Sequence, residues 1–222
     1  MLALPKSTEF NKRIPKKKFY ENLNVTQEIR KIFIDQIESI YWKNKLATST
    51  LNVKAGERVT EIEIFEIKLN QKGLDSRVLS LIDREIPYHI VYLLEYEGEY
   101  QMWIGYKEQS AASSDRYKIS KYYNTGWSAL EDIDLHIEGL DMDMIYDSYV
   151  RQIAGVKLSY RKSRESESKI SLRDEIEKES MREKLMKQIV ELEKKAMNEI
   201  QPRRKWDMAQ EIKKLKEQLE GV

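Results

Sequence analysis

An acidic residue and a lysine, Glu66 and Lys68, stand two positions apart in a segment that predicts a β-strand. The segment from Val59 to Leu69 is rich in β-branched residues, and side chains two residues apart on a strand share one face. Carboxylates on a sheet face can hold Mg²⁺, and a nearby ammonium can position water or stabilise developing charge. The pair therefore predicts one possible chemistry, metal-assisted hydrolysis.

This placement resembles nucleases of the PD-(D/E)xK type, because the strand follows a helix and another strand and precedes a second helix. Such nucleases need an upstream acid as well, and here the preceding strand offers Asn52, with Glu28 or Glu38 on the first helix as substitutes. A same-face acid and lysine is more often a surface ion pair, worth about 0.2–1 kcal/mol. The Mg²⁺-dependent nuclease, active or degenerate, is therefore the alternative function, and only this alternative would require Mg²⁺ as a cofactor.

The composition removes most other catalytic and metal sites. The 222 residues include no cysteine and two histidines, His89 and His136, which excludes disulfides, thiolate catalysis, zinc fingers and iron–sulfur clusters. The acidic sets do not match a calcium loop. We expect no metal site and no cofactor, and we expect the alternating acids Glu61 and Glu63, like Glu95, Glu97 and Glu99, to face solvent.

A basic segment lies near the N-terminus. Residues 1–18 hold six basic residues and one acid, whereas residues 19–160 hold 16 basic and 23 acidic residues. The segment's aromatic neighbours, Phe19 and Tyr20, suit packing beside a nucleic-acid strand. The nucleic-acid contacts would come from Lys12, Arg13, Lys16, Lys17 and Lys18. The alternative is a solvated arm on the protein's own acidic surface.

Residues 19–160 predict one α+β domain with a mainly antiparallel sheet of about five or six strands and flanking helices. Three helices are expected, over Thr26–Lys43, after a cap at Asp75, and after a cap at Asp141 up to Gly155. Strands are expected over 48–53, 59–69, 89–96, 100–106, 117–123 and 133–137, with the clearest hairpin turning at Glu97-Gly98.

Residues 161–170 form a charged linker, and residues 171–222 predict a coiled-coil-like tail of two helices. Ser171 caps the first helix, and Pro202 separates it from the second. Each helix carries a narrow apolar seam, which a self-contained helical hairpin or another molecule would cover. The residues expected to bind a partner are Leu185, Ile189, Leu192, Arg203, Arg204, Trp206, Ile212, Leu215 and Leu219.

Five segments extend together over nearly the whole chain. They are the opening LPKSTEFNKRIPKKKFYENL, the run YWKNKLATSTLNV, the segment LIDREIPYHIVYLLEYEGEYQMWIGYK, the run GLDMDMIYDSYVRQIAG and the tail QPRRKWDMAQEIKKLKEQLE. Together they resemble the uncharacterised bacterial domain-of-unknown-function family 4391. Members of that family are typically encoded beside DNA methyltransferases and helicases of restriction-like, antiphage loci. The resemblance implies this setting, and it implies no reaction and no catalytic residues.

These observations favour a non-catalytic accessory subunit of a bacterial DNA-defence system. Its helical tail would bind a helicase or DNA methyltransferase of the same locus, or another copy of itself, because catalysis does not need a long helical tail and assembly does. A free nucleic-acid-binding module is a third possibility. We expect a cytoplasmic protein without a membrane partner, since the chain has no run of about 18 apolar residues and its opening lacks the apolar stretch of a secretory signal.

Overall fold

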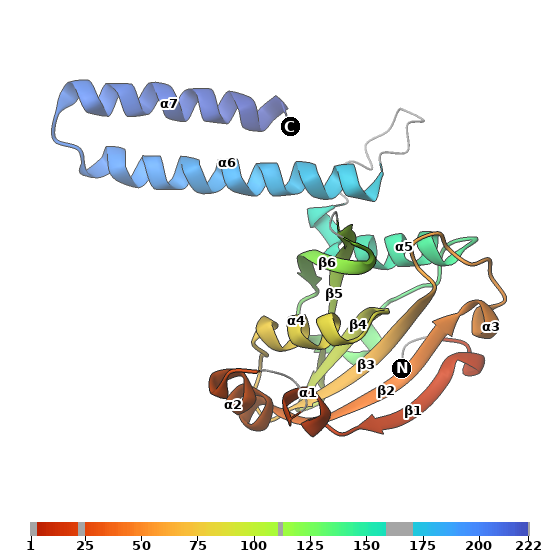
Figure 1. Cartoon of the computed structure of the whole chain (residues 1–222). Helices are drawn as coiled ribbons and strands as arrows, with labels where there is room; N and C mark the ends of the chain where they lie inside the picture. The colour runs from red at the N-terminus through yellow and green to blue at the C-terminus, as the bar shows by residue number, and fades with distance from the viewer. Residues whose placement is uncertain (1–3, 22–24, 111–112, 159–170, 222) are drawn as a thin grey trace. The chain divides into compact units, whose positions relative to one another are not determined.

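A computed structural model of the protein describes residues 4–21, 25–110, 113–158 and 171–221. The expected linker at 161–170 lies outside the described residues. The chain divides into two compact units, Met1–Gly155 and Val156–Val222, each described here by itself. The first unit holds a mixed sheet with helices on both faces, and the second holds two long helices (Figure 1).

Seven strands form the sheet in the order β1-β2-β3-β4-β5-β6, and β7 pairs with β5. Their bounds are Glu9–Ile14 (β1), Ile37–Ala47 (β2), Glu61–Leu69 (β3), His89–Tyr96 (β4), Glu99–Ser110 (β5), Ser113–Asn124 (β6) and Ser128–Ala129 (β7). Only β3 and β4 pair in parallel, because helix α4 (Ser76–Glu85) carries the chain between them. The fold is therefore α+β, as predicted, with one more strand than the upper expectation.

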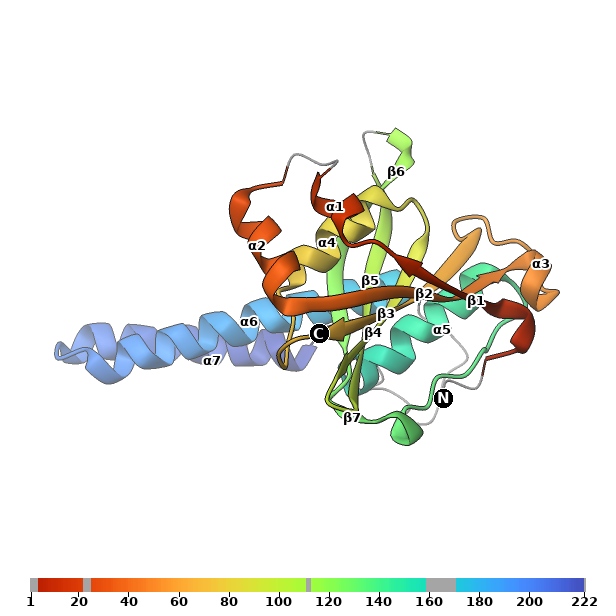
Figure 2. The ribbon, with the colours of Figure 1, turned by 90° about the horizontal axis from the view of Figure 1, so that it is seen from below.

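Helices cover both sheet faces (Figure 2). Helices α1 (Lys17–Glu21), α2 (Gln27–Gln36) and α4 pack on one face around Phe65 and Ile67 of β3. Helix α5 (Met142–Ala154) covers the other face and buries Ile145 and Tyr149. The shorter elements are η1 (Lys6–Thr8), α3 (Thr48–Leu51), η2 (Leu130–Asp132) and η3 (Gly155–Lys157). Burial on both sides accounts for the apolar residues on both faces of β3.

The predicted helix over Thr26–Lys43 is wrong in its second half. Thr26 caps α2 by accepting a hydrogen bond from Ile29 N, but the helix ends at Gln36 and β2 begins at Ile37. In β2, Ile37 and Ile40 are fully buried. Apolar spacings of three and four residues fit a strand that is apolar on both faces as well as a helix, and pairing with β1 and β3 decides for the strand.

Two predicted strands are also wrong. Residues 48–51 form α3, where Thr50 Oγ1 accepts a hydrogen bond from Ala47 N (2.9 Å). Residues 133–137 lie outside the strands because the Gln152 side chain takes the place of a neighbouring strand. Its amide donates to His136 O and accepts from His136 N, both at 2.9 Å. Local side-chain hydrogen bonds can replace ladder pairing in this way.

Several predictions are confirmed. The hairpin of β4 and β5 turns at Glu97-Gly98, and β6 contains the expected strand 117–123. Asp75 and Asp141 cap α4 and α5 by accepting hydrogen bonds from Arg77 N and Met144 N.

The second unit is a helical hairpin. Helix α6 (Leu172–Asn198) begins after the predicted Ser171 cap, and α7 (Pro202–Gly221) has Pro202 as its first residue. The two helices run back along each other (Figure 1), and Lys216 of α7 pairs with Glu193 of α6 at 2.8 Å. The self-contained hairpin, one of the two possibilities drawn from the sequence, is the arrangement found.

Asp143 fixes the loop before β3 to the start of α5. Its carboxylate accepts hydrogen bonds from the backbone N–H groups of Glu57 (2.9 Å), Arg58 (3.1 Å) and Val59 (2.7 Å). A Cβ at Gly56 would lie 2.2 Å from Asp143 Oδ1, so glycine is required for this close approach. The loop therefore depends on one carboxylate for three backbone hydrogen bonds.

We expect Asp143→Ala to lower the free energy of unfolding by about 1–3 kcal/mol, because the three donors lose their acceptor. Urea unfolding followed by circular dichroism measures the change. Asp132→Ala, which removes an exposed carboxylate from η2, is the matched control and should leave stability unchanged. Equal effects of the two substitutions would contradict this account of the loop.

Candidate functional site

Glu66 and Lys68 lie on β3 where the sequence places them, and they share one face of the sheet. Glu66 is opposite Tyr41 of β2, and Lys68 is opposite Glu95 of β4. This is the face away from Phe65, Ile67 and helix α2. The order along the chain is α2-β2-α3-β3-α4-β4, so a helix and a strand precede β3 as expected, with β2 in place of the strand predicted at 48–53.

A pocket of about 200 Å³ opens beside Glu66. Its polar lining comes from Glu9, Asn11, Lys43, Asn44 and Glu66. Lys43 Nζ lies 3.9 Å from Glu66 Oε2 and is the cation facing this carboxylate. The sequence analysis did not identify Lys43, because only the irregular pairing between Trp42 and Asn44 of β2 brings it to this position.

The upstream acid is not found among the substitutes drawn from the sequence. Asn52 ends α3 in the left-handed conformation, and Glu28 pairs with Arg77 at 2.8 Å on the other side of the sheet. Glu38 lies at the start of β2, where the pairing with β3 is irregular, and is exposed. Within the described residues, no group of three histidine, cysteine, aspartate or glutamate side chains could hold a metal ion. The residues around Glu66 thus give a salt bridge in a small pocket.

Glu61 and Glu63, expected to face solvent, are instead buried on β3. Glu63 is 1% exposed and Glu61 is 8% exposed. Their strand is central in the sheet, so the face that was expected to contact solvent is covered by other parts of the protein. The sequence signal was the apolar residues on both faces of the strand, Ile62 and Ile64 on one and Phe65 on the other, which is typical of a central strand.

The two carboxyl groups of this pair differ in protonation. Burial, together with a hydrogen bond to Glu61 and its charge, raises the pKa of Glu63 to about 9. Burial acts to raise the pKa of Glu61 too, but hydrogen bonds with Glu63 and Lys45 outweigh it and lower that pKa. At neutral pH the raised pKa keeps Glu63 protonated, and Lys45 pairs with the ionised Glu61.

This pair gives a pH-dependent stability. Since the folded pKa of Glu63 is about 9 and unfolded glutamate titrates near pH 4.3, its contribution to stability is complete below pH 4 and falls as pH rises toward 9. The free energy of unfolding of the wild type should fall by up to about 1.4 kcal/mol per pH unit over this range. We expect Glu63→Gln, whose amide keeps a donor, to remove this dependence. Urea midpoints from pH 5 to 9 measure it. Glu66→Gln is the control, and an unchanged slope in Glu63→Gln would refute the assignment.

A second buried ionic group joins α4 to β5 and β6. Lys107 of β5 lies 3.1 Å from Asp83 Oδ1, and Tyr122 of β6 donates to Asp83 Oδ2 at 2.6 Å. The ammonium also donates to the carbonyls of Asp83, Ile86 and Tyr88, which closes the C-terminal end of α4. Burial raises the pKa of Asp83 and lowers that of Lys107, and their attraction acts against both shifts. With these partners, Lys107 has a structural role.

Removing Lys107 alone should be costly, because Asp83 then lacks its charge partner. We expect Lys107→Met to lower the free energy of unfolding by about 3–5 kcal/mol, and the double variant with Asp83→Asn to recover part of this loss. Denaturant unfolding of both single variants and the double variant measures the coupling. Strictly additive effects would show that the two side chains do not act as a pair.

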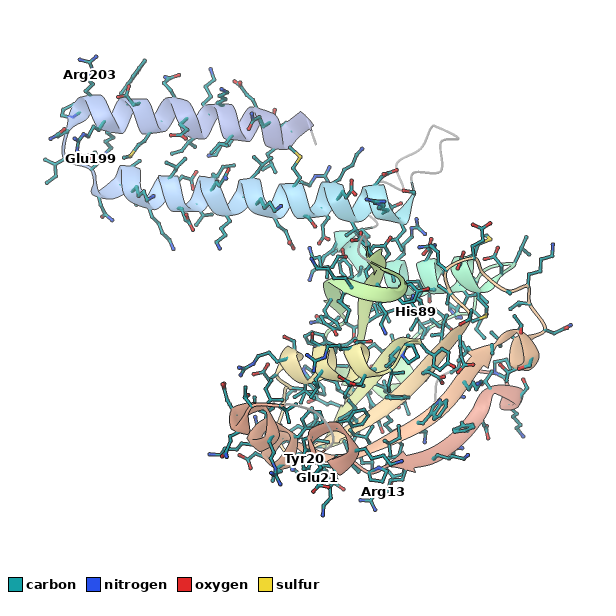
Figure 3. All side chains as sticks on the ribbon, viewed as in Figure 1. Arg13, Tyr20, Glu21, His89, Glu199 and Arg203 are labelled. Atoms are coloured by element: carbon teal, nitrogen blue, oxygen red, sulfur yellow. The ribbon has the colours of Figure 1, made fainter. Side chains whose placement is uncertain are left out.

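The predicted basic segment is built into the sheet unit. Lys12 and Arg13 lie on the edge strand β1, paired with Trp42 and Tyr41, and Figure 3 shows Arg13 at the border of this unit near Tyr20 and Glu21 of α1. The segment forms β1 and α1, where a solvated arm was the alternative drawn from the sequence. Lys16 donates to the carbonyls of Ile34 and Ile37 at the end of α2. Lys17 and Lys18 are exposed on α1, whereas Phe19 and Tyr20 are buried.

The predicted partner-binding residues of the tail divide into two groups. The seam residues lie between α6 and α7: Leu185 and Ile189 are buried, and Leu192, Ile212, Leu215 and Leu219 are half-buried. Arg203, Arg204 and Trp206 are exposed at the closed end of the hairpin, where Figure 3 shows Arg203 and Glu199. Two residues that the sequence analysis missed, Met197 and Ile200, are 80% and 92% exposed there.

The model of the family described as domain of unknown function DUF4391 matches residues 2–219, so the chain belongs to this family. No curated protein and no solved structure matches the chain. No helix in the described ranges has the length and apolar character needed to cross a bilayer.

Proposed function

We propose that this DUF4391 protein is a non-catalytic accessory subunit of a bacterial DNA-defence system of the restriction type. Its helical hairpin binds a helicase or DNA methyltransferase encoded in the same locus, in the cytoplasm. The family resemblance supports the setting, since such proteins are typically encoded beside these enzymes. The hairpin supports the mode of action.

The observation that carries the proposal is a set of exposed apolar side chains at the closed end of the hairpin. Met197, Ile200 and Trp206 are 80%, 92% and 63% exposed within ten residues of the chain. Large apolar side chains gathered on a surface mark interaction sites, and tryptophan and arginine are enriched where binding energy concentrates. The seam carries less of the argument, because α6 and α7 bury Leu185 and Ile189 between them and leave its other residues half-buried.

The charges at the same end favour an acidic partner surface. Arg203, Arg204 and Lys205 occupy the first turn of α7, and that turn contains no acid. Positive charge at a helix N-terminus opposes the helix dipole, so these residues are not explained by helix stability. An acidic partner surface would offset this unfavourable placement.

We expect the tagged full-length protein to co-purify with a helicase or methyltransferase from a host that carries the neighbouring genes. Ile200→Ser combined with Trp206→Ser should abolish this recovery, because the apolar contacts are lost. Leu140→Ser is the matched control, since Leu140 is 78% exposed in the sheet unit. Light scattering on the same variants tests self-association through the same surface.

Three outcomes would overturn the proposal: recovery of no neighbour by the wild type, equal losses in the hairpin variant and the control, or Mg²⁺-dependent cleavage by the purified protein that Glu66→Ala removes. The last outcome would favour the nuclease alternative. What supports that alternative is the order of elements around β3 and the shared face of Glu66 and Lys68. Against it stands Tyr41, which occupies the position opposite Glu66 on β2.

A further inference from the structure

A second cavity in the sheet unit lies away from Glu66, between α2, α4 and β6. It has a volume of about 580 Å³, within the usual range for small-molecule and cofactor sites. Val25, Thr26 and Ile29 line it from the start of α2, and Arg77 and Arg84 line it from α4. Tyr117, Lys118 and Ile119 of β6 form the opposite wall. We call it the α2–α4–β6 groove.

The lining of this groove is positively charged. Arg77, Arg84 and Lys118 contribute three cations, and Asp83 is the one carboxylate in the lining. The Asp83 side chain is 1% exposed. Beneath the surface it pairs with Lys107 and accepts a hydrogen bond from Tyr122. The cations are accessible, since the side chains of Arg77 and Arg84 are 50% and 65% exposed. Carboxylates at the rim pair with both arginines, Asp75 (2.7 Å) and Glu28 (2.8 Å) with Arg77 and Glu85 (3.2 Å) with Arg84, so a ligand phosphate would exchange with ion pairs at the surface.

Two further features suit an anion at this position. The first turn of α2 lines the groove, and a helix N-terminus favours negative charge. Glu28 of that same turn already pairs with Arg77 at 2.8 Å, which shows that a carboxylate reaches this arginine. The Glu28 side chain is 67% exposed, so an incoming phosphate can replace it with little loss of packing.

The remaining lining suits a flat ring. Val25, Ile29, Leu81 and Ile119 provide apolar walls, and Ser80 adds a hydroxyl. The ring of Tyr117 is anchored, because its hydroxyl donates to Arg58 O at 2.7 Å. Bases bound without sequence preference rest on aromatic and apolar side chains while cations hold the phosphates.

We propose that the α2–α4–β6 groove binds a nucleotide, with Arg77, Arg84 and Lys118 on the phosphate and the apolar walls against the base. The nucleotide is either free or part of a single strand, since both present the same groups. This goes beyond the assembly role, because a nucleotide in the sheet unit needs no partner at the hairpin. It also assigns nucleic-acid contact to a surface other than the basic segment near the N-terminus.

The test uses the full-length protein and fluorescence anisotropy with labelled single-stranded DNA, single-stranded RNA, duplex DNA and a labelled adenine mononucleotide. We expect Arg84→Gln combined with Lys118→Gln to weaken binding at least about tenfold at 0.1 M salt and to reduce the salt slope by roughly 1.4. Lys17→Gln combined with Lys18→Gln is the matched control, because it removes two exposed charges from the basic segment. The control should bind as the wild type does, and circular dichroism should show both variants folded.

Mononucleotide binding with this dependence on Arg84 and Lys118 identifies a free nucleotide as ligand, and binding of the single strands alone identifies a strand. The proposal is overturned if the wild type binds no probe, if it binds only the duplex, or if the control loses as much affinity as the groove variant. These readouts are separate from co-purification through the hairpin, so either proposal can fail without the other.

Discussion

The parallel pairing of β3 and β4 is the constraint on which the sheet unit depends. A parallel pair needs a crossover, and α4 provides it by packing on the face that holds Phe65 and Ile67. The crossover makes β3 a central strand, and α5 covers its other face. Burial on both faces then determines which side chains are hidden, including the carboxyl groups of Glu61 and Glu63.

Polar groups secure this arrangement at three places where burial of apolar side chains alone gives no unique geometry. The Lys107 ammonium closes the end of α4 against β5 and β6, and the half-buried Asp143 carboxylate holds the loop that enters β3. On β3 itself, burial raises the pKa of Glu63 beside the Glu61–Lys45 ion pair. Polar groups removed from water are costly unless they are paired, so these contacts favour one arrangement of the elements.

The two units offer different surfaces. The hairpin covers its own seam and leaves apolar and basic side chains at its closed end, which suits a protein partner. The sheet unit has a cationic groove beside α2 and α4, whereas the pocket at Glu66 combines two carboxylates with a single ammonium. The two proposed activities, assembly and nucleotide binding, therefore involve separate residues.

The sequence determined the elements whose signals are local. Caps at Thr26, Asp75 and Ser171, the turn at Glu97-Gly98 and the break at Pro202 each depend on a few adjacent residues. Tertiary structure decided that residues 37–47 are a strand and that the basic segment joins the sheet edge, because spacings of three and four residues do not distinguish a helix from a strand buried on both faces. Tertiary structure also decided which cation lies beside Glu66 and which carboxylates are buried. Both depend on pairing across strands and on the position of a strand within its sheet, which residues far apart in the chain determine.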